Sequence, residues 1–374
     1  MIRRLYIHNF RCLENFELRL DKMSSVLLIG NNGSGKTSVG MALEILQSIA
    51  RGTNRASGLV RPKDLTRGRD SVPMRFEIEI ELNSKIYTYA LAFEFPDGFK
   101  EPRVVKERLA VDGNPIFNRE LAQVRLRRPG KDVEPSFAID WHLVALPIVQ
   151  QTSKNDPLFI FRQWLANTLI LRPIPSMARG DSESSGTLQP NPQMTNFGEW
   201  FTGLLVSAPS AYEKISDYLK GVMPDFQALK NTATGRDSRS LSIQFSNRQG
   251  TVEIPFEDLS DGEKCFLICA LVMAANDACG PLLCFWDEPD NYLAPGEVGA
   301  TVIALRKAFR DKGQLIVTSH NPEAIRHFVD TNTLILFRHS HLEPTMSRSI
   351  EDLRIKGDLK GNFIDALVRG DIAP

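Results

Sequence analysis

Residues 26–37 read VLLIGNNGSGKT, an apolar run followed by a glycine-rich loop that ends in Gly35-Lys36-Thr37. The apolar run predicts a buried strand, and residues 38–50 predict a helix directly after the loop. Strand, loop and helix in this order are the context in which the pattern G-x-x-x-x-G-K-[ST] cradles phosphates. Glycines let several backbone N–H groups point at one anion, and the helix N-terminus adds its positive dipole end. The stretch therefore predicts a nucleoside triphosphate site.

The predicted phosphate loop gives its polar groups distinct tasks. Lys36 is expected to contact the β- and γ-phosphates, and the Thr37 hydroxyl is expected to bind Mg²⁺. A chance glycine loop is the alternative, and the correct pattern on both flanks disfavours it. The nucleotide-binding candidates are Gly30, Asn31, Asn32, Gly33, Ser34, Gly35, Lys36 and Thr37.

Composition bounds the class of protein without choosing a function. The chain has 374 residues, which suggests about two domains, and 42% of them are hydrophobic, enough for a substantial core. Lys and Arg total 45, as do Asp and Glu, so net charge favours neither a nucleic-acid coat nor a membrane surface. No apolar run is long enough for a membrane span, and residues 1–6 lack the apolar centre of a secretion signal. The cysteines form no C-x-x-C pair, which favours reduced thiols in the cytoplasm over a metal site.

Hydrophobic periodicity predicts the elements around this motif. Apolar residues alternate with glutamates over 76–82, as in a half-buried strand, and from Leu259 onward helices alternate with buried strands, as in α/β proteins. The expected order is strands at 2–7 and 16–20, a loop at 51–70, a hairpin at 74–95, a strand pair at 103–118, a helix at 137–172, a flexible loop at 173–195, helices at 196–221, and strands near 225–230, 240–246 and 251–256. No sustained heptad pattern predicts a long coiled coil.

These patterns divide the chain into four parts. Residues 1–50 and 255–345 are expected to form a split ATP-binding core, and 51–135 a β-lobe with a basic loop. Residues 136–254 are expected to form a helical lobe that contains the flexible loop 173–195. The last segment, 346–374, has apolar residues at helical spacing and either packs on the core or docks a partner chain.

An acidic pair, Asp287 and Glu288, ends the apolar run PLLCFW at 281–286. Two ionised carboxylates at the end of a buried strand are costly unless a cation or a reaction uses them. Asp287 suits the Mg²⁺ shell, directly or through water, and Glu288 is placed to polarise an attacking water. The alternative, a strand that simply reaches solvent here, is weakened by the phosphate loop.

A second apolar run, 315–319, ends at His320. Parallel sheets bind ligands at the carboxyl ends of their strands, so His320 and Glu288 are expected to lie close together. His320 would then contact the γ-phosphate and report its presence. A histidine that only caps or fills the core is the alternative.

Residues 259–264 read LSDGEK and precede an apolar helix. Ser260 and Glu263 fit the capping box S-x-x-E, so a well-capped helix is the simplest interpretation. The same helix start also offers a second anion site. One chain cannot easily wrap both sites around one nucleotide, whereas a second copy related by a two-fold axis can, so a homodimer is expected. The candidates that act across this dimer are Ser260, Asp261, Gly262 and Glu263.

Together these segments resemble ABC-type ATPases of the branch that includes RecF, SMC and OLD-related proteins. The resemblance covers residues 1–50 and 255–340 and rests on the segment IHNFR at 7–11 and on the phosphate loop, the LSDGE segment, the acidic pair and His320. It implies an α/β fold, a P-loop NTPase head of the ABC type with an antiparallel β-lobe and an inserted helical lobe. It also implies ATP and Mg²⁺ as ligands, ATP hydrolysis as the activity, and Arg11 as a basic residue near the nucleotide.

Two features depart from the pattern of these ATPases. Ala294 stands where they often carry Asp or His, so the usual contact across the dimer is in doubt, with Asp290 or Asn291 as substitutes. The glutamine that couples the lobes has no clear position, and Gln150 and Gln151 are candidates.

Three functions compete. The leading hypothesis is a switch in which ATP closes two copies and Glu288-assisted hydrolysis opens them, in DNA repair or phage defence with a separate effector protein. The second is a nucleotide-gated sensor or scaffold with little hydrolysis, which the missing coiled coil favours over chromosome tethering. The third is the motor subunit of a transporter, which the long stretch between Lys36 and Ser260 and the β-rich insertion at 72–118 disfavour.

Two basic segments leave nucleic-acid binding open. A solvated flexible loop explains them as well as phosphate contact does, and the scarcity of aromatic residues argues against base stacking. One segment holds Arg51, Arg55, Arg61, Lys63, Arg67 and Arg69, and the other Arg125, Arg127, Arg128 and Lys131.

Overall fold

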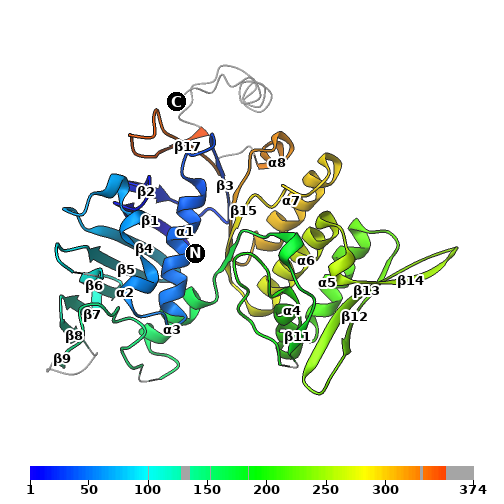
Figure 1. Cartoon of the computed structure of the whole chain (residues 1–374), viewed down its shortest axis with the longest axis horizontal. Helices are drawn as coiled ribbons and strands as arrows, with labels where there is room; N and C mark the ends of the chain where they lie inside the picture. Colours follow the sequence, from blue (N-terminus) through cyan, green and yellow to red (C-terminus); the bar gives the residue numbers. More distant parts are fainter. Residues whose placement is uncertain (100, 128–134, 152, 184, 329–331, 351–374) are drawn as a thin grey trace.

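Figure 1 shows the computed structural model, which describes residues 1–99, 101–127, 135–151, 153–183, 185–328 and 332–350. These residues form three sheets. A mostly parallel sheet lies in the middle, a large antiparallel sheet on one side of it, and a smaller sheet with several helices on the other (Figure 1). None of the described helices is long and apolar enough to cross a membrane.

The central sheet has the strand order β10-β15-β16-β3-β17-β18, and only β18 runs antiparallel to its neighbour. Every residue of β3 is buried because both faces of the sheet are covered. Leu27 and Ile29 pack in one core with α6 and α7, whereas Val26 and Leu28 pack in a second core with α1. The strands are β3 (Ser25–Ile29), β10 (Leu169–Leu171), β15 (Leu283–Asp287), β16 (Gln314–Thr318), β17 (Thr333–Phe337) and β18 (Met346–Ser349). The helices between them are α1 (Lys36–Ala50), α6 (Asp261–Cys279), α7 (Pro295–Phe309) and α8 (Pro322–Phe328).

The antiparallel sheet has the order β2-β1-β4-β5-β6-β7-β8-β9. Buried and partly exposed residues alternate along β4, which is the expected pattern for a sheet with one face on the core. The hairpin predicted over 74–95 and the strand pair predicted over 103–118 are confirmed. The strands are β1 (Ile2–His8), β2 (Phe16–Arg19), β4 (Met74–Leu82), β5 (Lys85–Glu94), β6 (Arg103–Val111), β7 (Asn114–Glu120), β8 (Gln123–Leu126) and β9 (Ser136–Ala138).

The third sheet lies beside α4 (Phe197–Ser207) and α5 (Ala211–Val222), and α5 packs on α6. Its strands confirm the three predicted between 225 and 256 and add the short β11. They are β11 (Ser182–Glu183), β12 (Phe226–Ala233), β13 (Ser238–Asn247) and β14 (Gly250–Pro255). Two short helices complete the elements, α2 (Ala56–Leu59) and α3 (Pro157–Ala166), with 3₁₀ turns at Pro62–Asp64, Thr66–Gly68, Pro175–Met177 and Phe256–Asp258.

The helix predicted over 137–172 is wrong for most of its length. Only α3 is helical, and it begins after Asp156, whose side chain accepts a hydrogen bond from the Leu158 N–H. Leu169–Leu171 forms β10, which pairs in parallel with β15. Its strand conformation comes from this distant partner rather than from its local pattern.

The flexible loop predicted at 173–195 is largely irregular, but its described residues are packed rather than loose. Ala178 and Met194 are fully buried. The backbone of Gly198 lies so close to Gly180 that a Cβ atom there would come within 2.2 Å of the Gly180 carbonyl oxygen. Glycine thus allows backbone segments to approach where a larger residue could not.

The sheets also cross the predicted part boundaries. β1 and β2, expected in the ATP-binding core, belong to the antiparallel sheet, and β10, expected in the helical lobe, is an edge strand of the central sheet. Met346–Ser349 forms β18, and the remainder of the predicted C-terminal segment after residue 350 lies outside the described residues, as do Arg128 and Lys131.

A buried charged network ties residues 140–146 to the antiparallel sheet. Glu107 is 1% exposed and accepts hydrogen bonds from the Ala145 and Leu146 N–H groups at 2.6 and 2.8 Å and from the Tyr89 hydroxyl at 2.9 Å. Arg119, 2% exposed, lies 3.6 Å from the Glu107 carboxylate. Burial raises the pKa of Glu107, and the backbone N–H groups and the arginine oppose that rise.

Candidate nucleotide-binding site

Three segments distant in sequence meet at the carboxyl edge of the central sheet. The loop after β3, the end of β15 and the end of β16 come together there because these strands are parallel neighbours. A cavity of about 420 Å³ lies at this edge. Its walls are Arg11, Cys12, Asn32, Gly33, Ser34, Gly35, Lys36, Thr37, Ser38, Arg67, Glu288, His320, Arg338 and His341.

The loop 30–37 has a backbone that only glycine allows at three places. Gly30, Gly33 and Gly35 have φ angles of 149°, 80° and 104°. A Cβ atom on Gly30 would also lie 2.0 Å from the Leu336 carbonyl oxygen. α1 begins at Lys36 and has no side-chain cap, so the first N–H groups of the helix can face an anion.

Lys36 is folded into the loop that precedes it. The residue is 6% exposed, and its Nζ donates to the carbonyl oxygens of Gly30 at 2.7 Å and Asn31 at 3.3 Å. Burial lowers the pKa of Lys36, while Glu288 and Asp287 oppose this. A bound phosphate would supply the close anionic partner that carbonyl oxygens do not provide.

Thr37, which lines the cavity, and Asp287 bring a hydroxyl and a carboxylate together. Thr37 Oγ1 donates to Asp287 Oδ2 at 2.8 Å, and Thr318 Oγ1 donates to Asp287 Oδ1 at 2.6 Å. A hydroxyl and a carboxylate suit Mg²⁺, which takes one or two protein ligands and completes its shell with phosphate and water. Among the described residues, no cluster of three or more His, Cys, Asp or Glu side chains could hold a metal ion.

Glu288 lies beside His320, as the strand order predicted. Its Oε1 is 3.0 Å from His320 Nε2, and its Oε2 accepts a hydrogen bond from Asn291 Nδ2 at 2.6 Å. The backbone of Glu288 is left-handed, with φ 54°, a conformation that costs energy in a residue with a side chain. Burial and the Lys36 ammonium lower the pKa of His320, against the effect of Glu288.

The residues after Glu288 are held inside their own chain. Asp290 is 5% exposed, and its Oδ2 accepts a hydrogen bond from Ser319 Oγ at 2.9 Å. Asp290 is therefore not available for a contact across a dimer, which corrects one of the two predicted substitutes for Ala294. Asn291, the other, is exposed but directs its amide to Glu288.

Arg11 lines the cavity, where the resemblance placed it. Its guanidinium donates to Asp64 Oδ1 at 2.9 Å, and its backbone has a φ of 53°. Asp64 follows Arg61 and Lys63, which line a neighbouring cavity of about 320 Å³ together with Arg11. The N-terminal segment and the loop after α2 thus meet beside the start of α1.

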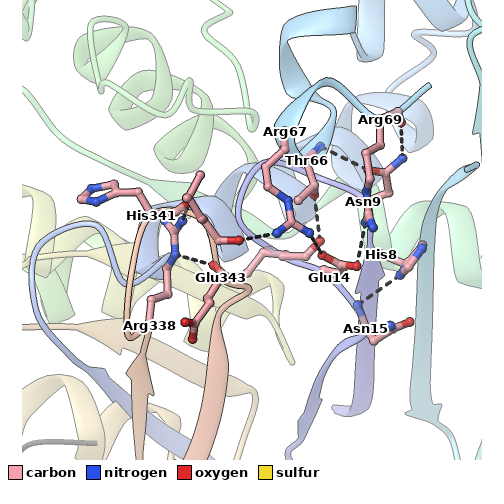
Figure 2. A network of polar contacts seen from close by, with 12 residues as sticks. His8, Asn9, Glu14, Asn15, Thr66, Arg67, Arg69, Arg338, His341 and Glu343 are labelled. Atoms are coloured by element: carbon pink, nitrogen blue, oxygen red, sulfur yellow. Dashed lines mark hydrogen bonds and ion pairs between the residues drawn. The ribbon is translucent and has the colours of Figure 1, made fainter. Parts of the chain in front are cut away.

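Sequence motifs did not reveal the turn between β17 and β18, residues 338–345, which borders the phosphate loop. Figure 2 shows Arg338 and His341 of this turn beside Arg67, which donates to the Leu342 carbonyl oxygen and to Glu14. Arg67, Arg338 and His341 all line the cavity. No motif marks Arg338 and His341, because their turn reaches the site only through the pairing of β17 with β3.

The segment Ser260–Glu263 caps α6 as predicted. Ser260 Oγ accepts from the Glu263 N–H at 3.3 Å, and Glu263 Oε2 accepts from the Ser260 N–H at 2.8 Å and from its hydroxyl at 2.7 Å. Neither Ser260 nor Asp261, Gly262 or Glu263 is among the described residues that line the cavity. The structure thus leaves the second predicted anion site apart from the first within one chain.

The two candidates for the lobe-coupling glutamine lie away from the cavity. Gln150 and Gln151 are exposed and do not line the cavity among the residues described, and Gln151 accepts a hydrogen bond from Arg162. Neither glutamine thus contacts the cavity in the described structure, and the position of a lobe-coupling glutamine stays a prediction.

The basic loop at 51–69 is more ordered than a solvated loop. Arg51 donates to two backbone carbonyl oxygens, and burial lowers its pKa to about 10. Arg55 pairs with Glu101, while Arg67 and Arg69 both pair with Glu14. These pairs compete with phosphate contact, so this loop supports nucleic-acid binding less than its composition indicated.

The chain is similar to known proteins in sequence and in fold. Residues 25–326 match the family described as "AAA domain, putative AbiEii toxin, Type IV TA system". The SMC head bound to the C-winged helix domain of ScpA has a TM-score of 0.57 and 14% identity, with 94% of this chain and 99% of that chain covered. An SMC head with an extended coiled coil, bound to the C-terminal domain of ScpA and derived from Pyrococcus furiosus, has a TM-score of 0.52 and 12% identity, with 94% and 97% covered. No curated protein matches the sequence. The predicted fold, that of an ABC-type ATPase head, is confirmed by its similarity to the fold of these SMC heads.

Proposed function

The chain belongs to the family of AAA domains described as putative AbiEii toxins of type IV TA systems, and from this premise we propose that it is an ATP-dependent switch that binds and hydrolyses ATP with Mg²⁺. One observation carries the proposal: a single cavity is walled by the phosphate loop, Glu288 and His320. A polarising carboxylate and a triphosphate cradle in the same cavity are the requirements of phosphoryl transfer to water.

Each residue has a task in this proposal. The N–H groups of the loop and Lys36 would bind the phosphates, and Thr37 and Asp287 would hold Mg²⁺, which would supply positive charge to offset that of the phosphates. Glu288 orients a water and accepts its proton as the water oxygen bonds to the γ-phosphorus, while the bond to the β–γ bridging oxygen breaks and ADP leaves with that oxygen. His320 donates a hydrogen bond to the γ-phosphate.

We further propose that ATP joins two copies head to head. Ser260 at the start of α6 is exposed and lies outside the cavity of its own chain, with its hydroxyl held by the Glu263 carboxylate. In a two-fold arrangement each Ser260 would reach the γ-phosphate bound by the partner's loop. The Glu263 carboxylate, which holds Ser260 now, would release the hydroxyl for this contact.

A second candidate function is a nucleotide-gated sensor that hydrolyses ATP slowly, and one observation favours it. His320 Nε2 lies 3.0 Å from Glu288 Oε1, so the histidine must leave this contact before Nε2 can donate to the γ-phosphate. A nucleotide-gated sensor that controls a separate effector in phage defence or DNA repair fits such slow turnover. The SMC heads of similar fold are bound to a domain of ScpA, and a protein partner is proposed here by analogy.

The test is a mass measurement in solution. Glu288→Gln keeps the shape of the side chain and removes its charge, so this variant is expected to bind ATP with Mg²⁺ and to accumulate as a dimer, with hydrolysis about 100-fold or more below wild type. Lys36→Ala is the matched control and is expected to stay monomeric. A Glu288→Gln protein that remains a monomer at saturating ATP overturns the dimer, and wild-type turnover by it overturns the role of Glu288.

A further inference from the structure

The β17–β18 turn holds the phosphate loop from its outer side. Arg338 Nη1 donates to the Gly33 carbonyl oxygen at 3.2 Å, and Thr345 Oγ1 donates to the Ser34 carbonyl oxygen at 2.9 Å in a buried hydrogen bond. A Cβ atom on Gly35 would lie 2.8 Å from Thr345 Oγ1, so loop and turn are in tight contact. Two successive loop carbonyls are thus fixed by side chains more than 300 residues away in sequence.

These outer contacts matter because a phosphate loop must aim its N–H groups inward. A peptide unit that points its N–H toward the phosphates points its carbonyl away from them, so the carbonyl of the Ser34–Gly35 peptide needs an outer donor. The Gly33–Ser34 peptide donates its N–H to the Asn31 carbonyl oxygen at 3.1 Å, and Arg338 holds this turn from outside. A buried carbonyl without a donor costs free energy, and a loop that can rotate its peptides to find one loses the aligned N–H groups. Binding to a loop that is already aligned costs less ordering entropy.

The turn is itself anchored, so it can act as a support. Arg338 Nε donates to the Glu343 carbonyl oxygen at 3.0 Å and Nη2 to the His341 carbonyl oxygen at 2.5 Å, which fixes the plane of the guanidinium. The Thr345 N–H donates to the Cys12 carbonyl oxygen at 2.9 Å. Figure 2 shows Arg338, His341 and Glu343 of the turn together with Arg67, Thr66 and Glu14 of the loops beside it.

We propose that Arg338 and Thr345 are positioning residues that set the shape of the phosphate loop and thereby its affinity for the triphosphate. The inference rests on the proposed nucleotide binding and deepens it. Arg338 has a further effect. Its guanidinium donates to the neutral carbonyl oxygens of Gly33, His341 and Glu343, so its charge adds positive potential to the cavity wall.

The experiment compares paired variants on the same hairpin. Thr345→Val removes the hydroxyl at nearly constant volume, and Thr345→Ser restores it. Ser347→Ala is the matched control, since the Ser347 hydroxyl donates to the Glu17 carbonyl oxygen, away from the loop. Arg338→Gln is matched by Arg348→Gln, since Arg348 stacks on Phe337 with its Cζ 4.8 Å from the ring centre.

The readouts are the Kd for a fluorescent ATP analogue with Mg²⁺, the KM and kcat of hydrolysis, and thermal unfolding without nucleotide. Thr345→Val and Arg338→Gln are expected to raise Kd and KM about 3- to 10-fold with kcat within twofold of wild type, the loss of one hydrogen bond. Thr345→Ser and both controls are expected to bind as wild type does.

The inference is overturned, while the proposed function stands, if both Thr345→Val and Arg338→Gln bind the analogue with the wild-type Kd. It is also overturned if the control variants weaken binding equally. A lower unfolding temperature with unchanged Kd would also overturn it, because that is the outcome of a purely structural role. If Thr345→Val does not fold, the Kd of Arg338→Gln tests the inference, with Thr345→Ser as the folded variant for comparison. If the wild-type protein itself fails to bind the analogue, the proposed function falls and this inference falls with it.

Discussion

The Glu288 carboxylate lies between His320 and Asn291, with Nε2 of the histidine 3.0 Å from Oε1 and Nδ2 of the asparagine 2.6 Å from Oε2. Asn291 follows Glu288 by one turn of chain, and the left-handed backbone of Glu288 folds the two side chains toward each other. The asparagine amide thus restricts the rotation of the carboxylate that would polarise water.

Asn291→Ala tests this restraint. Without the amide the carboxylate can adopt more orientations, so kcat is expected to fall about 3- to 10-fold, the scale of one ordinary hydrogen bond, while the Kd for ATP stays constant. Single-turnover hydrolysis and nucleotide titration measure the two quantities. Asn291→Asp should be slower still, because it places a second negative charge against Glu288. A kcat equal to that of wild type in Asn291→Ala would show that the contact is incidental.

Asp290 predicts a pH-dependent stability. Burial raises its pKa from 3.8 to about 6, so the folded state holds this proton more tightly than the unfolded state. Its favourable contribution is complete below about pH 4 and is lost as the pH rises through about 6. Relative to wild type, Asp290→Asn is therefore expected to gain about 1–3 kcal/mol in free energy of unfolding between pH 4 and pH 8.

Urea unfolding of wild type and Asp290→Asn at several pH values measures this gain. Titrations that both proteins share cancel in the difference. A difference that does not vary with pH would mean that the Asp290 carboxyl titrates normally in the folded state.

Asp287 predicts the metal dependence of hydrolysis. Asp287→Asn replaces an anionic Mg²⁺ ligand by a neutral one, so the Mg²⁺ concentration for half-maximal hydrolysis is expected to rise about 10-fold or more. Thr318→Val removes the hydroxyl that orients this carboxylate at 2.6 Å and is expected to cause a smaller rise in the same direction. Hydrolysis measured over a Mg²⁺ series, with EDTA as the zero point, distinguishes them. An unchanged requirement in Asp287→Asn would place the metal elsewhere.

The buried pair in the antiparallel sheet predicts a large stability effect away from the site. Arg119→Met leaves the Glu107 carboxylate buried without its cation, which is expected to cost about 3–5 kcal/mol. Adding Glu107→Gln removes the stranded charge and should recover part of that loss. Chemical denaturation of the single and double variants gives the coupling between the two sites. Additive losses would mean that the backbone N–H groups alone satisfy Glu107.

The sequence predicted best what adjacent residues determine. The loop 30–37, the capping box at Ser260 and the alternation in β4 depend on residues close in the chain, and the ends of β15 and β16 follow from the rule for parallel sheets. The strand β10 was missed because its conformation depends on pairing with β15, which lies more than 100 residues away.

The same reason explains what was missed at the site. Arg338 and Thr345 occupy no motif, and their contacts with Gly33 and Ser34 exist only because β17 pairs with β3. The contact between Asn291 and Glu288 is local, but it needs the positive φ of Glu288, which side-chain patterns do not reveal. Arg51 looked like a surface cation and instead satisfies buried carbonyls.

The start of α6 does not line the cavity that Lys36 lines. In the proposed dimer, the number of completed sites would therefore depend on subunit concentration. A molecule that carries two complementary halves of a site completes neither by itself, so in the proposed assembly completed sites grow with the square of subunit concentration while most molecules are alone. Doubling expression would then raise output about fourfold. Modest changes in synthesis would become steep changes in response, without any dedicated regulatory domain.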